Sequence, residues 1–290
     1  MKINTLEKVI VIVGCGGLGT HLAASLLAAN TSLVITSTND ETLQNAKDAI
    51  IGDALHKENL HTIVCDVTQK SDCHSLAGFI DDLGGGCDLL INCVGSHYSV
   101  GPFADSDFED WQADINVNFV GVARAVHSLL PHLQQRGGLI LNFAGGGGAG
   151  SRPNFSSYAS AKTALVRLTE TIADENAENG VRANIIAPGM MPTKLLKCAA
   201  HQGVSEVEKA KANDVLTALP PDNFVAVEKL VNFLFSGVGK NLSGFYLSAQ
   251  WDNYDVLADE FQSSGGSAIS DVFKLRRIVG GMIDRKDLDK

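Results

Sequence analysis

Short, uninterrupted apolar runs recur along the chain and alternate with stretches of helical spacing. The runs are rich in β-branched residues and read KVIVIV (8–13), SLVIT (32–36), HTIVC (61–65), DLLIN (88–92), LILNF (139–143) and VRANII (181–186). Such runs are typical of strands in a parallel sheet that is covered on both faces. Between them, apolar residues three and four apart predict helices, as from Trp111 to Leu133. The alternation predicts an α/β fold with a doubly wound parallel sheet, the Rossmann fold.

The chain has 290 residues, a length that suits one large α/β domain. We expect the Rossmann-type domain in residues 1–250, with a substrate loop at about 189–222, and an extension in residues 251–290 that packs on the same domain. The net charge of −10 argues against nucleic acid and anionic membranes as partners. The apolar run near the N-terminus is too short for a signal segment or a membrane span, so we expect a cytoplasmic protein.

The cysteines are scattered, without a CxxC pair or a nearby histidine at metal-ligand spacing. We interpret them as reduced thiols of a cytosolic protein and expect no metal site. They are Cys15, Cys65, Cys73, Cys87, Cys93 and Cys198.

A glycine-rich turn follows the first predicted strand and precedes a helical pattern. Its residues Gly14, Gly16 and Gly19 fit GxGxxG, with Gly17 and Leu18 between the last two. In this setting the chain must turn tightly, and backbone N–H groups at a helix start approach a pyrophosphate. The turn therefore predicts a dinucleotide site; the alternative is a glycine-rich turn that binds nothing.

The end of the second strand bears on the choice of nucleotide. NAD enzymes of this type place an acidic residue there to bind the ribose hydroxyls, whereas this strand ends at Ser37 and Thr38. Residues 38–41 read as a capping box that opens the next helix and occupies Glu41. With neither an acid to repel a 2′-phosphate nor a basic residue to attract one, NADP is favoured over NAD.

Further motifs occur in the order of one known family. They are Asp66-Val67, Asn92-Cys93-Val94-Gly95, Asn118-Phe119-Val120-Gly121, the Tyr158-Ala159-Ser160-Ala161-Lys162 segment, and Pro188-Gly189 leading to Thr193. With the glycine turn they resemble the short-chain dehydrogenase/reductase family from residue 8 to about 250. The resemblance implies cofactor contacts at Asp66, Val67, Asn92, Gly95, Tyr158, Lys162, Pro188, Gly189 and Thr193.

The resemblance also implies catalytic roles. Tyr158 would be the proton donor or acceptor, and Lys162 would grip the nicotinamide ribose. A free tyrosine has a pKa near 10, so it needs a nearby positive charge to work at neutral pH; Lys162, one helical turn away, can supply it. Asn118 would hold a water molecule that passes protons to Lys162.

Two features depart from the family pattern. The glycine turn is one residue shorter than the usual signature, and Ala144 and Gly145 stand where the family carries a catalytic serine. Other groups that could donate a hydrogen bond to the substrate oxygen in place of the serine are the backbone N–H groups of residues 145–148, Ser151, and His97 with Tyr98. The alternatives are a flexible glycine loop without a donor role and, favoured for His97, a histidine on a surface loop.

We expect an oxidoreductase that moves hydride between a nicotinamide cofactor and a secondary alcohol or ketone. The PNFSSYASAK and LRRIV segments resemble a subgroup associated with carbohydrate substrates, and Met190 and Met191 would shape the pocket. The rival hypothesis is a nucleotide-binding sensor or scaffold that retains the fold without the chemistry. By resemblance, the 111–133 helix and the helix at Tyr158 would form a homodimer or homotetramer.

Overall fold

The computed structural model describes residues 8–52, 56–193, 196–197, 206–217, 222–254, 256–257 and 259. Cys198, the LRRIV segment and most of the predicted extension at 251–290 lie outside the described residues, as does part of the predicted loop at 189–222. The division of the chain at residue 250 therefore stays a prediction.

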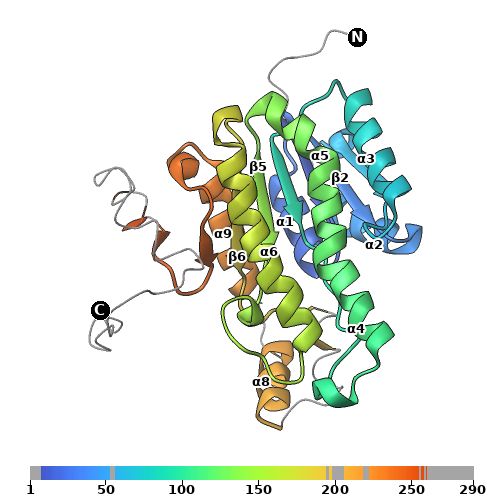
Figure 1. Ribbon diagram of the computed structural model, residues 1–290. Helices are drawn as coiled ribbons and strands as arrows, with labels where there is room; N and C mark the ends of the chain where they lie inside the picture. The colour runs from blue at the N-terminus through green and yellow to red at the C-terminus, as the bar shows by residue number, and fades with distance from the viewer. Residues whose placement is uncertain are drawn as a thin grey trace.

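Seven parallel strands form one sheet in the order β3-β2-β1-β4-β5-β6-β7, which confirms the predicted doubly wound fold (Figure 1). The strands are β1 (Lys8–Val13), β2 (Thr31–Ser37), β3 (Leu60–Val64), β4 (Leu89–Asn92), β5 (Leu139–Phe143), β6 (Arg182–Ala187) and β7 (Tyr246–Ser248). The first six match the predicted apolar runs. The sequence did not predict β7, because a strand of this length has too few residues to show a pattern.

Helices cover both faces of the sheet. They are α1 (Gly17–Leu26), α2 (Asp40–Ile51), α3 (Lys70–Asp82), α4 (Phe108–Ile115), α5 (Val122–Arg136), α6 (Ser156–Glu175), α8 (Glu206–Thr217) and α9 (Asp222–Phe235). Alternate residues of β1 point to opposite faces: Ile10 and Ile12 pack with α1, α2 and α9, whereas Val9 and Val11 pack with α3 and α5. Among the described residues, no helix is long and apolar enough to cross a membrane.

The predicted helix from Trp111 to Leu133 is present and contains a π-helical segment. This segment, Asn116–Gly121, separates α4 from α5 and brings Gly121 so close to Val67 that an added Cβ would lie 2.5 Å from the valine side chain. The apolar residues of α5 that suggested a subunit interface, such as Val126 and Leu129, are already buried within one chain. Assembly into a dimer or tetramer stays a prediction, without that physical support.

The start of α2 differs from the predicted capping box. Asn39, not Thr38, caps this helix, and its side chain accepts a hydrogen bond from the Thr42 N–H at 2.9 Å. Asp40 and Glu41 lie in the exposed first turn, where their negative charges interact favourably with the helix dipole. Glu41 therefore does not have the reciprocal capping role that the sequence suggested.

We expect Asn39→Ala to lower the free energy of unfolding by about 1 kcal/mol, because it leaves an N–H group of α2 without its acceptor. Glu41→Ala should change it by less than about 0.5 kcal/mol. Urea denaturation of the two variants and the wild type measures both values. A larger loss for Glu41→Ala than for Asn39→Ala would restore the capping-box interpretation.

Candidate active site

A cleft of about 980 Å³ opens at the carboxyl ends of the strands. The chain reverses direction across the sheet between β1 and β4, the topological switch point at which α/β proteins bind ligands. Most predicted cofactor residues line this cleft: Gly14, Gly16, Gly17, Leu18, Gly19, Ser37, Thr38, Asp66, Val67, Gly95, Tyr158, Lys162, Pro188 and Thr193. Asn92, Asn118 and Gly189 do not belong to its lining.

The glycine turn forms one wall of the cleft. Gly16 precedes α1 without a side-chain cap, so the first N–H groups of this helix are left to a ligand. A Cβ at Gly19 would lie 2.1 Å from the Gly14 carbonyl oxygen, whereas a Cβ at Gly16 would meet nothing within 4 Å. Gly19 thus serves close packing, and Gly16 leaves open space beside the backbone. This arrangement fits a pyrophosphate despite the shorter turn.

Two of the predicted residues outside the lining have structural contacts. Asn92 donates a hydrogen bond to Asn142 across neighbouring strands at 2.8 Å. The Asn118 side chain accepts from the Ser96 N–H at 3.1 Å and donates to the Ser96 carbonyl and the Asp114 carbonyl, each at 3.0 Å. Because its amide is engaged in this way, a proton relay at Asn118 would use the backbone carbonyl.

The third is Gly189, the second residue after the end of β6. Its φ of +77° favours glycine, and a Cβ there would lie 2.5 Å from the Gln250 side chain. The turn that follows β6 therefore depends on this glycine.

Tyr158 and Lys162 lie on the inner face of α6, 6% and 3% exposed. The Lys162 Nζ donates to the Val94 carbonyl at 3.3 Å and lies 5.6 Å from the centre of the Tyr158 ring. Burial lowers the pKa of Lys162 to about 8, an effect that the nearby Cys93 opposes. The structure therefore places Tyr158 and Lys162, the two residues that the sequence indicated, close together.

Burial raises the pKa of the Tyr158 hydroxyl, and the positive charge of Arg152 opposes this rise. The Arg152 guanidinium lies 3.9 Å from the centre of the Phe155 ring and 5.6 Å from that of Tyr158. The sequence predicted Lys162 as the helping positive charge and did not indicate Arg152.

At Gly145 the Tyr158 hydroxyl occupies the space of a side chain. A Cβ on this glycine would lie 2.8 Å from the hydroxyl oxygen. The Gly145 carbonyl accepts hydrogen bonds from the Gly148 N–H at 2.8 Å and the Tyr246 hydroxyl at 3.1 Å. The glycine run is thus a 3₁₀ turn with fixed contacts. Phe143 and Ala144 line the cleft, whereas the glycines and Ser151 do not.

His97 is not a surface residue, so the favoured sequence interpretation is wrong. It is 8% exposed, lines the cleft, and packs edge-on against Tyr158 with 4.5 Å between ring centres and 79° between ring planes. Its ring also lies 5.1 Å from that of Phe155. Tyr98, by contrast, is 55% exposed. No local pattern distinguishes these neighbours, because their burial depends on α6.

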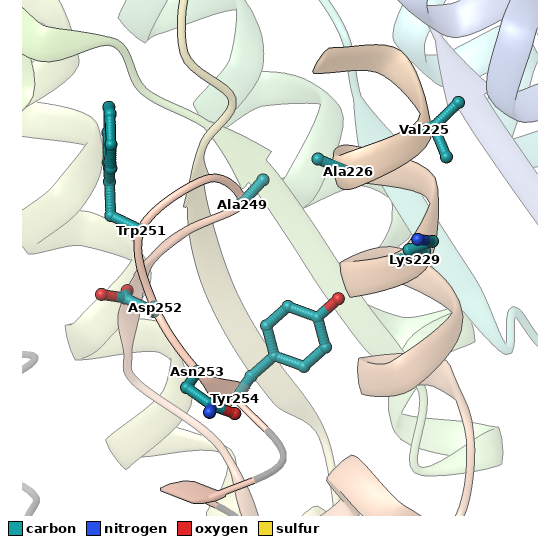
Figure 2. Close-up of a pocket in the computed structure, with 8 residues that line it drawn as sticks. All are labelled: Val225, Ala226, Lys229, Ala249, Trp251, Asp252, Asn253 and Tyr254. Carbon is teal, nitrogen blue, oxygen red and sulfur yellow. The ribbon is translucent and has the colours of Figure 1, made fainter. Parts of the chain in front are cut away.

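A second cavity, of about 580 Å³, lies between α9 and the segment after β7 (Figure 2). The exposed Trp251 ring and the Tyr254 ring lie on one side of it, and Lys229 of α9 lies on the other. None of the predicted site residues lines this cavity.

The pKa of Lys162 gives a prediction about stability. Since the folded pKa of about 8 lies below the ordinary 10.5, the unfolded chain holds the proton more strongly, and wild-type stability should rise between about pH 8 and 10.5. Lys162→Met should therefore be more stable than the wild type at pH 7, by a margin that shrinks toward pH 10. Urea denaturation at both pH values measures this, with Lys70→Met on the exposed surface as control. A less stable Lys162→Met protein at pH 7 would contradict a net cost of burying this charge.

Comparison with known proteins agrees with this geometry. The family model described as short chain dehydrogenase matches residues 8–203. The D-beta-hydroxybutyrate dehydrogenase of Rhizobium meliloti is 28% identical over 235 residues, 78% of this chain and 90% of that protein. The structure of ElxO with NADP bound is 25% identical, covers 84% of this chain and 97% of its own, and has a TM-score of 0.70.

NAD+-bound xylitol dehydrogenase shares the fold, with 24% identity, coverage of 86% and 98%, and a TM-score of 0.70. The family model alone covers well over half of the chain. Together with the glycine turn and the Tyr158–Lys162 pair in one cleft, it shows that this protein belongs to the short-chain dehydrogenase family of oxidoreductases.

Proposed function

We propose that this protein transfers hydride between a nicotinamide cofactor and a secondary alcohol or ketone, with carbohydrate-type compounds as the first substrates to test. The observation that carries the proposal is the position of Tyr158 and Lys162 in the same cleft as the glycine turn. A cofactor bound along this cleft would have its pyrophosphate at Gly16 and its reactive end near Tyr158.

The cofactor and the residues of the site have separate roles in hydride and proton transfer. When bound, the nicotinamide supplies or accepts the hydride. In the direction of reduction, the Tyr158 hydroxyl gives its proton to the substrate oxygen; in the direction of oxidation, it takes the proton back. Lys162 and Arg152 favour the phenolate form of Tyr158 through their positive charges.

The rival, a sensor without turnover, has one observation in its favour, which is the absence of a side chain at Gly145. A lost donor to the substrate oxygen costs about 10²- to 10³-fold in rate in other enzymes. Such a loss would leave a slow enzyme, not an inactive one.

We also propose that NADP is preferred over NAD. Ser37, Thr38, Asn39 and Thr42 line the cleft at the end of β2, and neither Asp40 nor Glu41 does. A 2′-phosphate at this strand end would meet neutral hydroxyl and amide groups; the carboxylates that do line the cleft are Asp66, after β3, and Asp110, on α4.

NADPH should therefore bind at least as tightly as NADH, as measured by fluorescence titration. Ser37→Asp should reverse this order, because an acid at the strand end binds the ribose hydroxyls and repels the phosphate. Ser37→Asn, of equal size without the charge, should not. Tighter binding of NADH by the wild type would show that another group takes the acid's place.

Activity should also fall when a side chain is added at Gly145. Gly145→Ala adds only the Cβ, which must displace the Tyr158 hydroxyl, and Gly145→Ser should be no better, since its hydroxyl arrives with the same Cβ. Tyr158→Phe should abolish turnover while cofactor binding is kept. NAD(P)H oxidation with a panel of carbonyl compounds measures all of them.

Two results would contradict these expectations. A Gly145→Ser protein faster by up to 10²- to 10³-fold would mean that the serine was simply lost from an otherwise standard site. A Tyr158→Phe protein as active as the wild type would exclude Tyr158 as the proton donor. A wild type that binds cofactor but converts no compound of the panel would favour the sensor.

A further inference from the structure

A buried carboxylate lies beside the cleft, outside the residues that the sequence indicated. Asp114, near the end of α4, is fully buried. One of its oxygens accepts from the Ser96 hydroxyl at 2.7 Å and the Tyr98 N–H at 2.9 Å; the other accepts from the Ser99 N–H at 3.0 Å and the Ser157 hydroxyl at 2.8 Å. Both oxygens are thus engaged, as a buried charge requires.

These bonds join three separate parts of the site. Ser96, Tyr98 and Ser99 belong to the loop after β4, and Ser157 directly precedes Tyr158 on α6. Asp114 is the common acceptor for the loop and the helix, which the bond from Lys162 to the Val94 carbonyl also links. We call Asp114 and these four bonds the Asp114 clamp.

Two residues of the clamp, Ser96 and Tyr98, flank His97 in the sequence. Asp114 holds the side chain of Ser96 before this residue and the backbone N–H of Tyr98 after it, while the His97 ring packs edge-on against Tyr158 at 4.5 Å. The Tyr158 ring is therefore held from its own helix and from the loop. Its hydroxyl points into the space that Gly145 leaves open.

We propose that Asp114 and His97 are positioning residues for Tyr158: the clamp sets the His97 ring, and this ring keeps the Tyr158 hydroxyl beside Gly145, which has no side chain to hold it. The inference rests on the proposed function, in which Tyr158 transfers the proton. In other enzymes a displacement of about 1 Å costs about 10²-fold in rate, so such support has a measurable effect.

Four variants separate the parts of this arrangement. Asp114→Asn keeps the shape but replaces one acceptor oxygen by an amide that faces donors. Ser157→Ala removes only the bond between the clamp and α6. His97→Ala removes the ring, and His97→Phe restores a ring of similar size without its nitrogen atoms.

The rate of cofactor oxidation in a single turnover should fall about 10²-fold in Asp114→Asn and His97→Ala, with a smaller loss in Ser157→Ala. His97→Phe should recover most of the rate, because the proposed role belongs to the ring's packing. The dissociation constant of NADPH should change by less than the rate does in all four, since the glycine turn is untouched.

A matched control separates positioning from general destabilisation. Asp88, at the opposite end of the sheet, accepts hydrogen bonds from the Val9 N–H at 2.8 Å and from Arg136 at 3.2 Å. Asp88→Asn should lower the melting temperature but keep the single-turnover rate. An equal loss of rate in Asp88→Asn at the same loss of stability would overturn the proposal.

Two further outcomes would overturn it. Wild-type rates in His97→Ala would show that the ring does not position Tyr158, and a His97→Phe protein as slow as His97→Ala would assign the role to the imidazole nitrogens instead.

If the wild type converts no substrate, the proposed function fails and the inference is tested by crystallography. The Tyr158 hydroxyl should then be displaced from Gly145 in the His97→Ala structure and in place in His97→Phe; an unmoved hydroxyl in His97→Ala overturns the inference.

Discussion

The site depends on the parallel direction of all seven strands. Parallel strands need crossover helices, and these cover both faces of the sheet, so the strands must be apolar on both sides. The same constraint brings every carboxyl strand end to one edge. The glycine turn, the loop at His97 and the glycine run therefore meet there, although they are far apart in the sequence.

Two ionisable side chains at this edge are buried, which costs free energy of folding when they carry a charge. Lys162 and Tyr158 lie in surroundings that disfavour their charged forms, which lowers one pKa and raises the other. The pKa of Lys162 thereby moves toward neutral pH, whereas that of Tyr158 moves away from it, so the two values move apart. The cores on the two faces of the sheet must stabilise the fold enough to carry this site.

The lack of a side chain at Gly145 leaves room for the Tyr158 hydroxyl. A serine in this place would offer a hydroxyl and keep the tyrosine at a distance; the glycine lets the Tyr158 hydroxyl move up to the backbone. Other groups fix the surroundings of Tyr158. The Tyr246 hydroxyl donates to the Gly145 carbonyl, and the His97 ring packs against the Tyr158 ring. The Asp114 clamp holds the loop after β4 and the start of α6. The Tyr158 hydroxyl thus fills the space beside Gly145, which is not an empty pocket.

The sequence by itself determined six of the seven strands, the glycine turn and the Tyr158–Lys162 pair. Those features are local: a strand buried on both faces needs an apolar run, a tight turn needs glycine, and residues four apart on a helix share a face. Only the tertiary structure decided the burial of His97 and the convergence of Ser96, Ser99 and Ser157 on Asp114. Each depends on contacts between segments that are distant in the chain, and a pattern of neighbouring residues carries no record of them.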